Sequence, residues 1–97
     1  MATTNRPQLH TLIEGETYKA IQLKGIPGMV IPYHHNTGEA LLIVKEGEAL
    51  LRMADGEHTL GVGSISIIPA NKEHTLTILT PFQAVKVMSL DAEIHFI

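Results

Sequence analysis

A chain of 97 residues with 44% hydrophobic side chains is long enough to enclose one hydrophobic core, so we expect residues 1–97 to form a single domain. Seven basic and ten acidic residues give a formal net charge of −3, and this balance argues against nucleic-acid binding. The chain has no cysteine, which excludes disulfide bonds, thiolate metal sites and cysteine nucleophiles.

The distribution of apolar residues argues against export and against a membrane span. The polar residues 1–8 form the expected loose N-terminal arm and lack the apolar core of a secretory signal. The longest wholly apolar run, Ala40–Val44, is far shorter than the ~20 residues that a membrane-spanning helix needs. We therefore expect a cytoplasmic protein without a membrane partner.

Short extended segments separated by turns make up most of the chain, and no segment has the period of a long amphipathic helix. Several segments alternate between apolar and polar residues, and glycine, proline or Asp-Gly separates them, as in sandwiches and barrels. The pattern therefore predicts an all-β domain with little helix. The expected strands are Leu9–Glu14, Thr17–Lys24, Met29–His35, Ala40–Lys45, Ala49–Ala54, Glu57–Leu60, Ser64–Ile68, His74–Leu79, Phe82–Leu90 and Glu93–Ile97.

The segment Ala40–Lys45 is apolar on both of its faces. Ala40, Leu42 and Val44 point to one side of a strand, and Leu41 and Ile43 point to the other. One face belongs to the interior of the domain, and the second needs a cover such as another sheet edge or another subunit. We expect a homodimer that uses the outer face of this strand.

Asp55-Gly56 is the strongest local turn signal in the chain. An Asp-Gly pair suits a two-residue type I′ turn, in which both central residues have positive φ. The flanking segments Ala49–Ala54 and Glu57–Leu60 are therefore expected to form a hairpin.

Two segments with histidine carry the candidate chemistry. His34 and His35 end one extended segment, and His74 begins another, forty residues after His34. Around the first, Gly28 is followed by five residues and His34, and Gly47 closes the segment. We interpret the two segments as facing walls of one small pocket.

The second segment has its own regular spacing. Gly63 is followed by five residues and Pro69, then by Asn71 and, after two more residues, by His74. The two spacings together resemble the two motifs of the cupin superfamily, and they cover residues 28–78, about half of the chain. The resemblance implies a double-stranded β-helix, also called a jelly-roll barrel.

The resemblance also implies a set of metal ligands, which this chain keeps only in part. The two histidines and the glutamate of the first motif and the histidine of the second are the usual ligands. Those slots fall on His34, Asn36, Ala40 and His74, and the final asparagine slot falls on Ile78. Neutral imidazole binds transition metals well, but without the anionic carboxylate the affinity should fall. The implied cofactor is one weakly held divalent ion (Fe, Mn, Ni or Zn), or none at all.

A second register of the first motif is also open. His35 and Glu39 have the spacing of a histidine and glutamate pair, which would place Tyr33 in the first histidine slot. A shift of one residue turns every side chain of a strand to the opposite face, so both registers hold only with a bulge in the turn. We favour the register anchored on Gly28 and Gly47. His35 then remains a doubtful fourth ligand, and Tyr33 and Ala40 are expected to line the pocket.

Two classes of function follow from this candidate site. The first is a module that binds a small molecule or a weakly held metal inside the barrel. The second is a metal-dependent enzyme of the dioxygenase or isomerase class that acts on a small polar molecule. Fold resemblance alone does not choose between them. Since the glutamate slot is lost, we favour the binding module, whereas the two retained histidines favour the enzyme.

Overall fold

The computed structural model describes residues 7–96, apart from the side chains of Pro32, Tyr33 and Phe96. Within this range the chain forms ten strands and no helix, which confirms the predicted all-β class. The strands are β1 (Gln8–Glu14), β2 (Tyr18–Gly25), β3 (Val30–Asn36), β4 (Ala40–Glu46), β5 (Ala49–Met53), β6 (Gly56–Leu60), β7 (Ile65–Ile68), β8 (His74–Ile78), β9 (Phe82–Ser89) and β10 (Ile94–Phe96).

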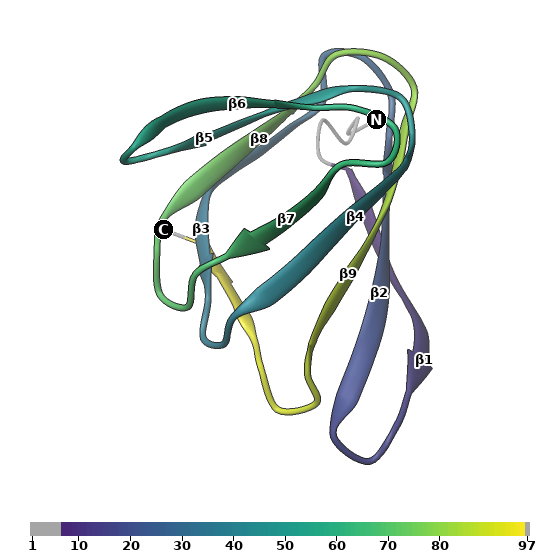
Figure 1. Cartoon of the computed structure of the whole chain (residues 1–97), viewed down its shortest axis with the longest axis vertical. Coiled ribbons are helices and arrows are strands. Elements are labelled where there is room, and N and C mark those ends of the chain that lie inside the picture. The colour runs from purple at the N-terminus through teal and green to yellow at the C-terminus, as the bar shows by residue number, and fades with distance from the viewer. Residues whose placement is uncertain (1–6, 97) are drawn as a thin grey trace, which may run out of the picture.

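The strands form two five-stranded sheets that face one another (Figure 1). The first sheet has the order β1-β2-β9-β4-β7, and the second has the order β10-β3-β8-β5-β6. All pairings are antiparallel, and apart from the β1–β2 and β5–β6 hairpins the neighbours in each sheet are not consecutive in the chain. This arrangement is the predicted jelly-roll barrel.

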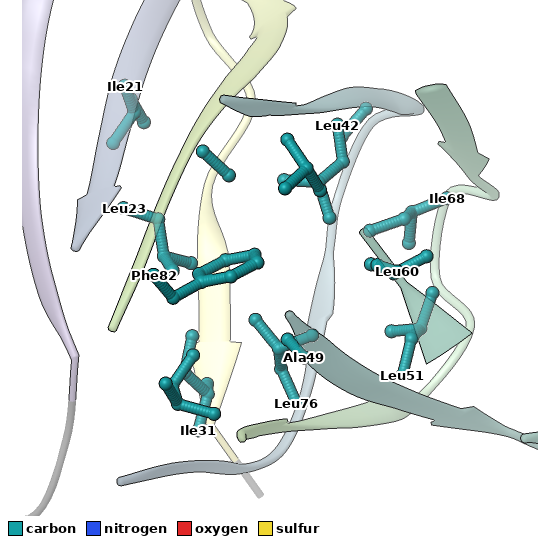
Figure 2. Packing of buried hydrophobic residues seen from close by; sticks show 14 of the residues in the cluster. Ile21, Leu23, Ile31, Leu42, Ala49, Leu51, Leu60, Ile68, Leu76 and Phe82 are labelled. Atoms are coloured by element: carbon teal, nitrogen blue, oxygen red, sulfur yellow. The ribbon is translucent and has the colours of Figure 1, made fainter. Parts of the chain in front are cut away.

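The core lies between the two sheets, where alternate residues of most strands point inward, although β1 is exposed along its whole length. Figure 2 shows Leu23 and Phe82 of the first sheet pointing toward Ile31 and Leu76 of the second. Each of these side chains is 4% exposed or less, so together they exclude water from the middle of the barrel. The expected alternation of inner and outer residues is therefore realised on both sheets.

Strand β4 has the two apolar faces that its sequence predicts. Ala40, Leu42 and Val44 are at most 2% exposed and belong to the core. Leu41 and Ile43 lie on the outer face of the first sheet and are only half-buried. The register places Leu41 beside Ile67 of β7, which is 52% exposed. Within the described chain, the outer apolar face is only partly covered.

The hairpin of β5 and β6 forms as expected, but the type I′ turn at Asp55-Gly56 is wrong. Met53 pairs with Gly56, so the two turn residues are Ala54 and Asp55. Neither has positive φ, whereas Gly56 has a φ of 130°. The glycine therefore relieves strain at the first position of β6, after the turn.

Two other turns depend on residues that accept positive φ. Gly47 follows β4 with a φ of 78°, and a Cβ atom there would overlap the carbonyl oxygen of Pro81. Asn71, in the loop before β8, has a φ of 60°. Asparagine is one of the few residues with a side chain that adopt this conformation readily.

The N-terminal prediction falls largely outside the described range. Of the expected arm, residues 1–6 lie outside it, Pro7 is buried and Gln8 begins β1. No helix that could span a membrane is found in residues 7–96.

Candidate functional site

His34 and His74 meet on the inner face of the second sheet. They are register partners on the neighbouring strands β3 and β8, and each is 1% exposed. Their ring centroids lie 4.0 Å apart with the planes tilted by 57°. A bulge in β3 between Ile31 and His34 shifts the register just before this pair. The two histidines therefore meet as predicted, but the expectation of facing walls is wrong, because β3 pairs directly with β8 and the two segments lie side by side in one sheet.

The loop before β8 fixes the tautomer of His74. The Nδ1–H of His74 donates a hydrogen bond of 3.0 Å to the carbonyl oxygen of Lys72, since a carbonyl can only accept. The nitrogen left for other partners is therefore Nε2. Burial is the main cause that lowers the pKa of His74, and the nearby charge of Lys86 lowers it further. The imidazole is consequently held in its neutral form.

Asn36 is the buried amide of the site. It lies two residues beyond His34 on the same face of β3 and is 0% exposed. Its side-chain Oδ1 and Nδ2 have no hydrogen-bond partner among the described residues. Its main-chain carbonyl accepts a 2.7 Å hydrogen bond from the N–H of Asn71, which ties the loop before β8 to the end of β3. A buried amide without partners is costly unless something else satisfies it.

Lys86 enters the same interior from the opposite sheet. It lies on β9 between the buried residues Ala84 and Met88, and its side chain is itself only 2% exposed. Burial lowers the pKa of Lys86 from 10.5 to about 8, so the ammonium form still dominates at pH 7. No hydrogen bond or ion pair of Lys86 is found within the described part of the chain.

A small cavity lies between the two histidines and Lys86, and Asn36 is not part of its lining. It has a volume of about 10 Å³ and is lined by His34 and His74 on one side and by Lys86 on the other. The remaining lining residues are apolar: Leu23, Ile31, Leu42, Ile68 and Leu76. A space of this size holds about one water molecule, and the polar groups around it would retain that water.

A larger pocket lies at the adjacent end of the barrel. Its volume is about 490 Å³, which is within the usual range for small-molecule sites. Met53, the register partner of His74 on β5, forms part of its wall. The turn of the β5–β6 hairpin and the loop before β8 supply the rest: Ala54, Asp55, Pro69, Asn71, Lys72 and Glu73. We call this space the mouth pocket.

The structure favours the first of the two registers. His34, Asn36 and Ala40 are buried, whereas Glu39 is exposed and His35 is only half-buried. The ring of His35 lies against His95 of β10, with centroids 5.4 Å apart, and is not part of the cavity lining. Ala40 belongs to the core of β4. The side chain of Tyr33, also expected in the pocket, lies outside the described residues.

The comparisons decide the family. A family model described as a cupin domain matches residues 26–90 of this chain. The chain belongs to the cupin family. A search of curated protein sequences finds no match.

Solved structures share the cupin fold at low sequence identity. A protein with a double-stranded β-helix domain from Klebsiella pneumoniae has 21% identity and a TM-score of 0.83, covering 99% of this chain and 83% of its own. A cupin superfamily protein from Desulfitobacterium hafniense has 19% identity and a TM-score of 0.79, covering 94% and 84%. The DMSP lyase DddQ from Ruegeria pomeroyi has 20% identity and a TM-score of 0.83, covering 92% of this cupin but only 50% of the lyase. These likenesses establish the fold.

The donor set of this cupin does not fit a tightly held metal ion. Among the described residues, no three histidine, cysteine or carboxylate side chains come together. His34 and His74 would be joined only by the amide oxygen of Asn36, and Ala40 leaves the carboxylate slot without a ligand. Lys86 lines the same cavity, and its positive charge, which also acts on His74, would repel a divalent cation there.

Sequence reasoning missed Lys86. It stands in the expected strand Phe82–Leu90, at an inward position shared with Phe82, Ala84 and Met88. The two-residue period of a strand contained this signal, because every second residue on either side is apolar. Lysine side chains are seldom fully buried, so Lys86 would ordinarily be assigned to the surface. Only the two-residue period of the strand indicates that it points inward.

Proposed function

We propose that this cupin is a binding module for a small polar molecule, held where the mouth pocket approaches the buried polar side chains of the barrel. The observation that carries the proposal is the amide of Asn36, which is fully buried and has no hydrogen-bond partner in the described chain. Leaving such a group unsatisfied costs ~1–3 kcal/mol of folding free energy, and a ligand with a donor and an acceptor would recover that free energy.

The mouth pocket supports this proposal by supplying room for the body of a ligand. Met53 and Pro69 give it apolar wall, and Asn71, Lys72 and Glu73 give it polar groups. Pockets with mostly apolar lining and a few polar groups are typical of small-molecule sites. Since Met53 pairs with His74, a ligand in this pocket lies one residue pair away from the histidines.

A metal-dependent enzyme of the dioxygenase or isomerase class is the alternative. The close pairing of His34 and His74 favours it, because two imidazoles are retained from the family's ligand set. Ala40 and Lys86 weigh against it, since one leaves out the anionic ligand and the other adds a cation. We therefore infer that an iron, manganese, nickel or zinc ion is held weakly or not at all.

A homodimer completes the proposed assembly. The outer face of the first sheet carries a continuous apolar surface across β7, β4 and β9, made of Ile65, Ile67, Leu41, Ile43, Val85 and Val87. Ile65 is 65% exposed, and an exposed patch of this kind is typical of an interface. A second copy of the same face would cover it through two-fold symmetry.

The binding proposal is tested by a thermal-shift screen of small polar compounds against three proteins. The wild type is compared with Asn36→Leu, which has the same number of side-chain heavy atoms without the amide, and with Gln22→Leu, which removes an amide from a half-buried position of β2 outside both cavities. A compound that raises the melting temperature of the wild type and of Gln22→Leu, but not of Asn36→Leu, supports the proposal. A compound set that stabilises all three proteins equally would place the binding away from Asn36 and contradict it.

A further inference from the structure

The interior of the barrel contains a cation without a balancing carboxylate. Lys86 is 2% exposed, and all ten aspartate and glutamate residues of the chain are exposed in the structure. A buried ammonium is normally paired, because taking it out of water is expensive without an opposite charge. The protein itself does not supply that charge within the described residues.

Lys86 lies beside the two histidines that this chain retains from the family's metal motif. Its cavity is shared with His34 and His74, which fill the first and last ligand slots. We propose that the ammonium of Lys86 takes over the role of the metal cation, and that the site binds the carboxylate group of a small acid. This inference specifies the ligand class of the proposed binding module and rests on that proposal.

The size and polarity of the site suit one carboxylate group. The cavity of about 10 Å³ has room for one water-sized atom, such as one carboxylate oxygen against Lys86. Asn36 lies two residues beyond His34 on the same face of β3, outside the cavity lining, and its Nδ2–H₂ has no partner among the described residues, so it offers a donor to a more distant polar group of the ligand. Hydrogen bonds between charged groups are about twice as strong as neutral ones, so Lys86 would contribute most of the affinity.

Two kinds of small acid, a free one-carbon anion and a longer monocarboxylate, carry the carboxylate that the site would bind. A free one-carbon anion would place one oxygen in the cavity and leave the mouth pocket empty, whereas a longer monocarboxylate would also extend its chain toward the mouth pocket beside Met53. Formate and butanoate represent these two cases as probes. Their relative affinities distinguish the two kinds of acid, because only butanoate gains from apolar contacts in the pocket.

The test is an NMR titration of the full-length protein with formate and with butanoate, followed on the side-chain amide of Asn36 and the imidazoles of His34 and His74. We expect saturable shifts in the wild type, and a dissociation constant at least about tenfold higher in Lys86→Met. Lys24→Met removes the same charge from an exposed position of β2 and should bind as the wild type does. Equal dissociation constants in all three proteins would overturn the proposal.

A second measurement covers the case in which Lys86→Met does not fold. Crystals of the wild type soaked in bromide should give an anomalous peak beside Lys86 in the barrel. Bromide found only at the surface would overturn the proposal. If formate, butanoate and bromide avoid the barrel while a neutral compound still binds through Asn36, the carboxylate inference alone fails. If neither kind of ligand binds there, the proposed function fails with it.

Discussion

His34 and His74 are register partners on β3 and β8, and their ring centroids lie 4.0 Å apart on the inner face of the barrel. The resemblance to the cupin motifs assigns this pair to a metal centre, but here the pair shares with Lys86 a cavity the size of one water. The two groups that remain from the metal motif thus stand in an electrostatic environment that repels cations.

The stability of the protein should rise between pH 8 and pH 10.5 because of Lys86. Burial lowers its pKa in the folded state to about 8, against an ordinary value of 10.5. Between these values the unfolded chain binds more protons than the folded one, so stability increases with pH. The penalty is fully present below pH 8 and amounts to ~3 kcal/mol at most.

Chemical denaturation of the wild type and Lys86→Met at pH 7 and pH 10 measures this effect. Lys86→Met should be more stable than the wild type at pH 7 and should lose most of that advantage at pH 10. The exposed variant Lys24→Met serves as the control and should follow the wild type at both pH values. A wild type whose stability stays flat from pH 8 to pH 10 would contradict the burial of a charged Lys86.

Asn36→Leu should separate stability from binding. Removing a buried amide that has no partner should stabilise the ligand-free protein by ~1 kcal/mol, while ligand-induced stabilisation is lost. Thermal unfolding with and without ligand checks both effects. Loss of stability in the ligand-free variant would mean that the amide is already satisfied in solution, for example by bound water.

The first-motif glycine Gly47 should tolerate substitution far less well than Gly56. Both have positive φ, but only at Gly47 would a Cβ atom meet another group, the carbonyl oxygen of Pro81. Gly56→Ala should cost ~1–3 kcal/mol through backbone strain alone. Gly47→Ala should cost more than ~4 kcal/mol, because the backbone of two strands must also move apart. Equal unfolding free energies for the two variants would refute the close approach at Gly47.

Ile43→Asp tests the proposed dimer. Ile43 stands in the middle of the outer apolar face, between Ile65 on β7 and Val85 on β9. A charge there should convert the dimer to a monomer or an aggregate, as measured by light scattering coupled to gel filtration. Val62→Asp, at a 72% exposed turn position, is the control and should leave the mass unchanged. An Ile43→Asp protein with the wild-type mass would exclude this face as the interface.

Much of the fold could be predicted because short strands leave a two-residue pattern and turns leave glycine, proline or asparagine. The pattern of Ala40–Val44 even indicated two apolar faces, and the spacing around Gly28 and Gly63 indicated that His34 and His74 meet. These features are local, or they depend on motif spacing within a known fold, so one sequence is sufficient to identify them.

Two features could not be predicted in this way: the contact of Lys86 with the histidine cavity and the exact turn of the β5–β6 hairpin. The strand period puts Lys86 on the inner face of β9, but only the packed barrel brings it to the histidines of β3 and β8. The turn at Ala54-Asp55 was also missed, because Asp-Gly favours several turn geometries and the pairing of Met53 with Gly56 selects one. Packing between the two sheets therefore decided the first point, and local pairing within the hairpin decided the second.

Metal analysis of the untagged protein tests directly whether the site at His34, His74 and Lys86 holds a metal ion. The wild type, His74→Ala and Lys86→Met are each incubated with iron, manganese, nickel and zinc salts, desalted, and measured for metal per chain. We expect far less than one equivalent of metal per chain in the wild type, because the carboxylate ligand is missing and Lys86 supplies the cation. About one equivalent in the wild type that is lost in His74→Ala would contradict it and establish a metal centre at His34 and His74.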